Sequence, residues 1–155
     1  KLEAFTETQL RIKFLTARDA WLQCLIKEIP TTNSLVYISK LTELYRVNLF
    51  DIITQYRAVF AGDDTTTPSI RLYIQVEDVN MKESSILPSW IHYKIESYLK
   101  QLETHLNELI ANDYNYYPID AIIDPCFYFG LSMSRIGSDF RPLLLPIFIN
   151  SFKQI

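Results

Sequence analysis

A chain of 155 residues is long enough to build one hydrophobic core, and a hydrophobic content of 48% excludes disorder as the default state. The net charge of −3 is the balance of 15 basic and 18 acidic residues spread along the sequence, which excludes the basic footprint of a nucleic-acid-binding protein. The three glycines are too few for the turns of a protein built from many short strands, so the composition favours helices.

The first predicted helix begins after Thr6 and ends before Pro30. Thr6 and Gln9 have the spacing of a capping box, and a proline does not continue the interior of a helix. The apolar residues of this helix cover a broad arc, which implies packing neighbours on two sides. The predicted core face consists of Leu10, Phe14, Ala17, Trp21, Cys24 and Leu25, and it is widened by Leu15, Leu22, Ile26 and Ile29.

The second predicted helix begins at a cap formed by Asn33 or Ser34 and continues to Ala61, with Gly62 directly after its end. Together with the first helix and the short turn that contains Pro30, it is expected to form an antiparallel hairpin. Its predicted core stripe consists of Ile38, Leu41, Tyr45, Leu49, Ile52, Ile53, Tyr56, Val59 and Phe60.

A flexible loop is predicted over residues 62–85, because helical periodicity fails there and Asp, Thr and Pro cluster between the periodic segments. The third predicted helix begins near Ser84 or Ser85, has Pro88 in its first turn and ends near Asn112. Its predicted core stripe consists of Leu87, Ile91, Ile95, Tyr98, Leu102, Leu106 and Leu109.

An aromatic turn over residues 113–117 precedes the fourth predicted helix. This helix has Asp124 as its cap and Pro125 as its first residue, and it reaches Gly137. The fifth helix completes the expected fold, an all-α, elongated antiparallel bundle of about five helices that forms a single domain over residues 1–155. Its expected signals are a cap at Ser138 or Asp139, Pro142 in the first turn, and a kink or delayed start at Pro146.

Cys24 and Cys126 are far apart in apolar helical segments, which predicts two buried thiols in a reducing compartment and no disulfide. No apolar run approaches the ~20 residues of a membrane span, and no signal peptide is visible. The chain begins at Lys1 and ends at Ile155 within a helical pattern, so we expect it to be part of a longer protein.

No arrangement of residues predicts catalysis. The two histidines, His92 and His105, are too far apart in sequence to bind a metal ion as a pair one helical turn apart. Asp63 and Asp64 are adjacent in the predicted loop and supply too few ligands for a cation. Cys126 has no neighbouring His or Lys that would activate it as a nucleophile. We therefore expect no enzyme activity, no metal site and no cofactor.

Several arginines stand within or beside apolar stripes, where an unpaired charge is costly. The structural interpretation is a set of interhelical ion pairs that fix the register of the helices, and the functional alternative is an arginine finger that acts on a partner GTPase. The arginines are Arg18, Arg46, Arg57, Arg135 and Arg141, and the expected acidic partners are Asp19, Asp51 and Asp139.

An interaction surface is predicted from apolar side chains that lie outside the stripes. Aromatic residues make up 14% of the chain, and Tyr, Phe and Trp are enriched in protein interfaces. Packing in a second layer within the bundle is the structural alternative. The candidate contact residues are Leu44, Val47 and Phe50 of the second helix, Tyr93 of the third, and Tyr114, Tyr116 and Tyr117 of the aromatic turn.

Three segments occur in a characteristic order: ARDAW at residues 17–21, LFDIITQYRAVF at 49–60 and YFGLSMSRIGSDFR at 128–141. With this order and spacing the chain resembles the family of the eighth subunit of the conserved oligomeric Golgi (COG) complex, a vesicle-tethering assembly. The resemblance extends from about Phe14 to Phe152 and is weakest from Gly62 to Ser85. It rests on the series of segments, because no short catalytic signature belongs to the family.

The resemblance implies a helical-rod scaffold that assembles with the other subunits of the tether, without catalysis or cofactor. It also implies retrograde intra-Golgi transport, which keeps glycosylation enzymes in place, and a peripheral location on the cytoplasmic face of the Golgi membrane. Membrane fusion proteins and small GTPases are further candidate partners; nucleic acid is not. The alternatives are a subunit of another helical-rod tether such as the exocyst, an all-α regulator of small GTPases, and a helical enzyme. No functional residue is carried over from the family.

Overall fold

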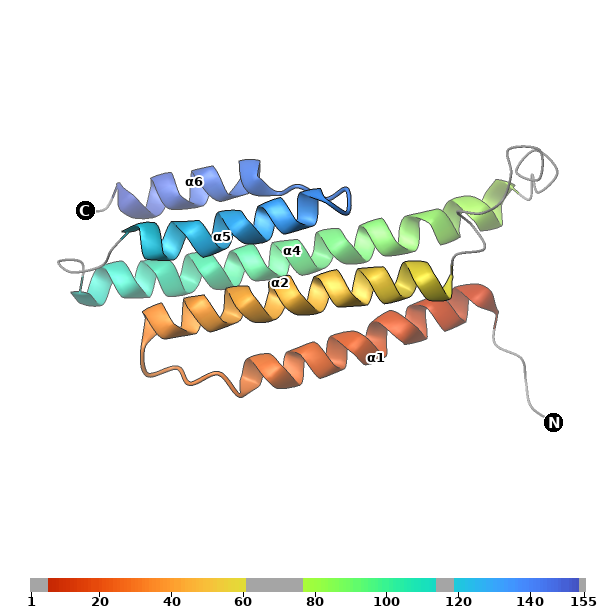
Figure 1. Ribbon diagram of the computed structural model, residues 1–155, viewed down its shortest axis with the longest axis horizontal. Helices are drawn as coiled ribbons and strands as arrows, with labels where there is room; N and C mark the ends of the chain where they lie inside the picture. Colours follow the sequence, from red (N-terminus) through yellow and green to blue (C-terminus); the bar gives the residue numbers. More distant parts are fainter. Residues whose placement is uncertain (1–5, 61–76, 114–118, 154–155) are drawn as a thin grey trace.

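The computed structural model describes residues 6–60, 77–113 and 119–153. Within these residues the protein is all-α, as predicted, and forms an elongated bundle whose helices lie side by side (Figure 1). None of the described helices is both long enough and apolar enough to cross a membrane. The helices are α1 (Glu7–Lys27), α2 (Ser34–Val59), α4 (Glu77–Asp113), α5 (Ile119–Ser134) and α6 (Arg141–Phe152).

Helices α2 and α4 occupy the middle of the bundle (Figure 1). α2 contacts α1, α4 and α5, whereas α4 contacts α1, α2 and α6. Helices α1 and α6 therefore lie at opposite edges. α2 and α5 run in one direction and α1, α4 and α6 in the other, so each helix is antiparallel to the next one in Figure 1. This arrangement confirms the predicted antiparallel bundle.

The predicted caps of the first two helices are present. Thr6 Oγ1 accepts a hydrogen bond from Gln9 N at 3.1 Å, and Gln9 Oε1 accepts one from Thr6 N at 2.9 Å. Asn33 Oδ1 accepts hydrogen bonds from Leu35 N and Val36 N at 2.9 and 3.2 Å. These side chains satisfy N–H groups that have no partner within the first turn of a helix.

The core contains the stripes predicted for α2 and α4. All seven predicted residues of the α4 stripe are buried, as are those of α2 from Ile38 to Tyr56. Val59 is 63% exposed, because it lies in the last turn of α2 and the following Phe60 packs against Phe14 instead. Burial of continuous apolar stripes on the two central helices is the main source of stability of such a bundle.

Buried aromatic rings join the central helices to α5 and to the turn before α6. The rings of Tyr45 and Tyr98 lie 5.2 Å apart, and those of Tyr98 and Phe129 lie 4.9 Å apart. Phe140 packs edge-on against Phe129 at 4.7 Å. Edge-to-face and tilted pairs at these separations add to the energy of burial, so this cluster holds four segments of the chain together.

Helix α1 buries a different face from the one predicted as its centre. Leu15, Leu22 and Ile26, expected only to widen the arc, are buried. Leu10 and Trp21 are 46% and 58% exposed, and Ala17 and Cys24 are exposed as well. Periodicity located both apolar faces of α1 but did not identify which one meets α2. The expected burial of Cys24 is also wrong, whereas Cys126 is buried as predicted, and both thiols are free.

Two prolines that were expected to mark helix starts lie inside helices instead. α4 begins at Glu77 rather than at Ser84 or Ser85 and continues through Pro88. Residues 77–85 of the predicted loop are therefore helical, and residues 61–76 lie outside the described ranges. α5 begins at Ile119 and continues through Pro125. An internal proline removes one helical hydrogen bond. Buried side chains on both sides, such as Leu87 and Ile91 in α4, keep the helix in place.

The turn between α5 and α6 begins earlier than predicted and differs in its cap. α5 ends at Ser134, and Gly137 has a φ of +91°, a left-handed conformation that side-chain-bearing residues rarely adopt. The N-cap of α6 is Phe140, while Asp139 Oδ1 accepts a hydrogen bond from Arg141 N at 3.0 Å. Pro142 lies in the first turn as predicted, and α6 continues through Pro146 without a delayed start.

Candidate interaction surface

The residues considered for metal binding have other contacts. His92 Nε2 lies 3.1 Å from Glu96 Oε1 on the surface, and the ring of His105 packs on Tyr37 with 3.9 Å between centroids. The described residues contain no group of three or more His, Cys, Asp or Glu side chains that could hold a metal ion. Asp63 and Asp64 lie outside the described ranges.

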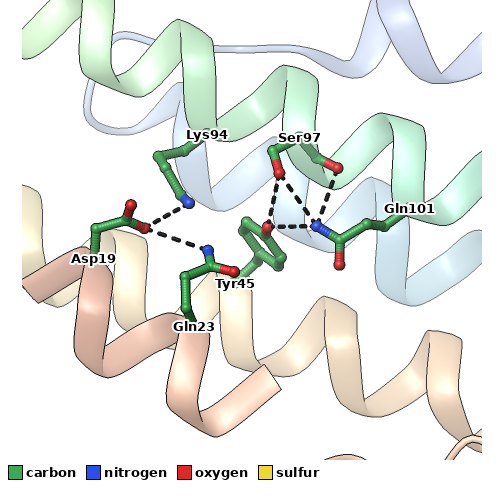
Figure 2. Close-up of polar contacts among 6 residues, drawn as sticks. All are labelled: Asp19, Gln23, Tyr45, Lys94, Ser97 and Gln101. Carbon is green, nitrogen blue, oxygen red and sulfur yellow. Dashed lines mark hydrogen bonds and ion pairs between the residues drawn. The ribbon is translucent and has the colours of Figure 1, made fainter. Parts of the chain in front are cut away.

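An ion pair that the sequence did not predict connects α1 to α4. Lys94 Nζ lies 2.5 Å from Asp19 Oδ1, and Gln23 Nε2 donates to the same oxygen at 3.4 Å (Figure 2). The Lys94 side chain is only 1% exposed, whereas that of Asp19 is 26% exposed. Lys94 is three residues after Ile91 on the buried stripe of α4, so its helical position is the sequence feature that could have predicted its burial. A paired charge at this depth fixes the register of two helices.

A second polar contact connects α2 to α4 beside this ion pair (Figure 2). Gln101 Nε2 donates to Tyr45 Oη at 2.9 Å and to Ser97 Oγ at 3.2 Å. Tyr45 Oη in turn donates to Ser97 Oγ at 3.4 Å. The buried ring of Tyr45 thus keeps a hydrogen-bonded hydroxyl, which is the usual condition for burying a tyrosine.

A third polar contact joins α2, α4 and α5 in the core. Thr42 Oγ1 and Tyr98 Oη lie 2.8 Å apart, and Tyr98 Oη donates to Cys126 Sγ at 3.3 Å. Burial raises the pKa of the Cys126 thiol, although its hydrogen bond with Tyr98 opposes the shift. The thiol stays protonated near neutral pH, so Cys126 is a packing residue rather than an activated nucleophile.

The same contact predicts loss of stability at alkaline pH. Burial raises the pKa of Tyr98 well above its ordinary value of 10.0. Above pH 10.0 the Tyr98 hydroxyl of the unfolded chain releases its proton, whereas the folded chain retains it. The stability that is present below pH 10.0 is therefore lost as the pH rises further. Between about pH 8 and about pH 10.5, we expect the urea midpoint to fall less in Tyr98→Phe than in the wild type. An equal fall in both proteins would contradict a Tyr98 contribution, and exposed Tyr93→Phe is the matched control.

The predicted register pairs between arginine and aspartate are wrong for the described helices. Arg141 does pair with Asp139, at 2.7 Å, but the two residues belong to the same exposed turn. Arg57 Nη2 donates to the carbonyl oxygen of Ile136 at 2.9 Å, and the Arg46 guanidinium lies 5.0 Å from the ring centroid of Tyr128. Arg57 and Arg46 thus contact a backbone carbonyl group and an aromatic ring instead of a carboxylate. The remaining predicted residues behave similarly: Asp19 pairs with Lys94 instead of Arg18, and Asp51 and Arg135 are exposed.

Three of the four predicted contact residues that lie within the described ranges are exposed. Val47 and Phe50 are 41% and 38% exposed, and Tyr93 is 64% exposed. Leu44 is half-buried and packs against the core, which favours the second-layer alternative for this residue. Tyr114, Tyr116 and Tyr117 lie outside the described ranges.

A surface pocket of about 400 Å³ lies between α2 and α5. Phe50 follows Arg46 of the pocket by one turn, and Leu131 follows Tyr128 of the pocket by one turn. Phe50, Tyr128 and Leu131 are all exposed, and we call them with the pocket the α2/α5 surface. The pocket is lined by Ser39, Thr42, Glu43 and Arg46 of α2 and by Asp124, Pro125 and Tyr128 of α5.

Comparison with known proteins places this bundle in a family. The family model described as "Dor1-like family" matches residues 1–155. The chain belongs to the Dor1-like family. No solved structure matches it. The Dor1-like chain is 38% identical over 154 residues to conserved oligomeric Golgi complex subunit 8 of Drosophila melanogaster. This alignment covers 99% of the Dor1-like chain and 26% of the relative.

Mammalian relatives give the same result. The human protein named conserved oligomeric Golgi complex subunit 8 is 41% identical over 148 residues, and the Bos taurus protein of the same name is 42% identical over 148 residues. Each alignment covers 96% of the Dor1-like chain and 22% of the relative. The chain thus spans about a quarter of the length of these relatives, and the predicted resemblance is confirmed.

Proposed function

We propose that this chain forms part of a non-catalytic subunit of the Golgi vesicle-tethering complex, where it acts as a rigid helical scaffold. The observation that supports this most strongly is the match of the Dor1-like family model to residues 1–155, together with relatives that are named as a subunit of that complex. This match also favours a Golgi tether over the exocyst and over a regulator of small GTPases.

The interior of the bundle supports a scaffolding role. Three of its polar contacts connect helices: Lys94 binds Asp19, Gln101 binds Tyr45, and Tyr98 binds Cys126. Fully paired buried groups of this kind rigidify a fold and define one packing arrangement. The proposed partners are the other subunits of the tether, with membrane fusion proteins and small GTPases as further candidates, on the cytoplasmic face of the Golgi membrane.

The proposed role in retrograde intra-Golgi transport can be tested by depletion. Cells that lack the full-length protein are expected to lose Golgi glycosyltransferases from their normal cisternae and to expose truncated surface glycans, and re-expression of the wild type should restore both. Normal enzyme distribution and normal lectin staining after complete depletion would contradict the proposal. Stimulation of nucleotide exchange or hydrolysis on a Golgi GTPase by the purified protein would instead favour the regulator.

We further propose that the α2/α5 surface is one contact site within the tether. Phe50→Asp places a charge among exposed apolar groups, so we expect about tenfold weaker binding of a partner subunit, equivalent to ~1.4 kcal/mol. The melting temperature should stay unchanged, because Phe50 is 38% exposed. Binding is measured by titration of the purified partner, with Thr54→Asp, also exposed on α2, as the control. A cooperative loss of folding in Phe50→Asp would assign Phe50 to the core.

A further inference from the structure

Helix α1 has an exposed apolar stripe with the spacing of a coiled-coil seam. Leu10, Phe14, Ala17, Trp21 and Cys24 follow one another at alternating steps of four and three residues. This repeat keeps side chains in line along one face of a helix and is the pattern by which one helix packs against another. We call these five residues the α1 seam.

Apart from Phe14, whose ring also packs against Tyr56 and Phe60, the α1 seam lies outside the face by which α1 joins its own bundle. That inner face consists of Arg11, Leu15, Leu22 and Ile26, all buried. On the seam, Trp21 is 58% exposed and Leu10 is 46% exposed. α1 lies at the edge of the bundle, where its contacts are with α2 and α4 (Figure 1). One helix therefore has two apolar faces, and the bundle covers one of them.

The seam is ordered in advance for binding. The ring of Phe14 is held edge-on against Tyr56 and Phe60, with centroids 6.2 and 6.1 Å away. Trp21 and Cys24 project from the same regular helix, so a partner would order few side chains on this surface. Large exposed aromatic residues on a rigid helix are typical anchors of protein interfaces, because their burial is favourable and costs little entropy.

The charges beside the α1 seam define the partner. The outer flanking positions of the repeat are Lys13, Ala20 and Lys27, and Arg18 lies on the inner flank, where Arg11 is buried and paired with Glu7 at 2.8 Å. Arg18 Nε is buried and has no hydrogen-bond partner within the described ranges. Two copies of this seam would place basic flanks opposite each other in either orientation, which is unfavourable. A helix with acidic flanks would instead pair with them.

We infer that the α1 seam docks an amphipathic helix of another subunit, with apolar residues at alternating steps of three and four and with Asp or Glu beside them. This inference rests on the proposed function, because it takes the partner from the same tether. It adds which face of the chain is used and what chemistry the bound helix has.

Site-specific photo-crosslinking in the full-length protein tests this directly. A benzophenone amino acid replaces Ala17 on the seam or, as the matched control, Thr16, which is exposed on the same helix away from it. After irradiation of the assembled complex, we expect position 17 to capture one peptide from another subunit, at least about fivefold more than position 16, with an acidic-flanked apolar repeat. Cys24 should also become protected from maleimide on assembly, as read from its own peptide by mass spectrometry.

Several outcomes would overturn the inference. Capture of a segment of the same chain, of a second copy, or of a peptide without acidic flanks would each do so, as would equal labelling at positions 16 and 17. If the complex assembles normally and Cys24 stays reactive, the inference fails while the proposed function stands. If the wild-type protein recovers no other tether subunit, the proposed function fails and the inference fails with it.

Discussion

Asp19→Asn is expected to lower the free energy of unfolding by about 3 kcal/mol, because it leaves the Lys94 ammonium buried without its anionic partner. The Lys94 side chain is 1% exposed, and its Nζ also lies 5.8 and 5.7 Å from the ring centroids of Tyr45 and Tyr93. Those rings attract a cation but do not replace a carboxylate. The amide introduced by this substitution would retain an oxygen acceptor without the charge, so shape and hydrogen bonding change little.

Substitution of Lys94, the other member of the pair, should behave differently. Lys94→Met removes the buried charge and keeps an apolar chain of similar length, while the Asp19 side chain, 26% exposed, can still be hydrated. We therefore expect a change within about 1 kcal/mol for Lys94→Met, and Lys94→Met should suppress most of the cost of Asp19→Asn in the double variant. Urea unfolding followed by circular dichroism measures all three. Equal losses in the two single variants would show that the buried lysine does not depend on Asp19.

Ala17→Glu should abolish docking at the α1 seam while leaving the bundle folded. Ala17 is exposed in the middle of the seam, so a glutamate there replaces an apolar contact with a charge that a partner would have to bury. The new carboxylate would also face the acidic flank inferred for the partner helix. We expect at least about a hundredfold weaker binding, equivalent to ~2.7 kcal/mol.

Thr16→Glu provides the matched control, because it introduces the same charge on an exposed position of the same helix outside the seam. Titration of the partner subunit with each purified full-length variant gives the two dissociation constants, and thermal unfolding shows whether each variant is folded. Similar affinities for Ala17→Glu and Thr16→Glu, both folded, would place the contact elsewhere on the molecule.

The sequence was sufficient to predict the central helices because each has one dominant apolar stripe. The α4 residues from Leu87 to Leu109 repeat at helical spacing and are flanked by polar residues, so the buried face follows from periodicity alone. α2 is similar, apart from Val59 at its end. Such helices have one face to bury and little ambiguity about which one it is.

Helix α1 could not be oriented in the same way. Its apolar residues form two overlapping arcs, and the wheel positions were interpreted as a core face centred on Phe14 and Trp21 and widened by the second arc. The inner arc also contains Arg11, and a charged residue usually faces water. Here it is 3% exposed, and its guanidinium donates to Tyr56 Oη at 3.2 Å. Only the shape of the neighbouring α2 decides between the two faces.

The candidate contact residues show the same limit for function. Val47, Phe50 and Tyr93 were selected because they lie off the stripes, and all three are exposed. Exposure identifies what a partner could contact, but the partner's own surface decides which of these residues is used. The α1 seam was missed as a surface because its residues had been assigned to the core. Helical periodicity shows that these residues share one face, but it does not show whether that face is buried.

The account is tested most directly by affinity capture of the tagged full-length protein from cells, followed by quantitative mass spectrometry. It predicts co-purification of the other subunits of the Golgi tethering complex in stable proportion, with recovery retained by Thr16→Glu and strongly reduced by Ala17→Glu. Recovery of no other tether subunit by the wild-type protein would contradict the account.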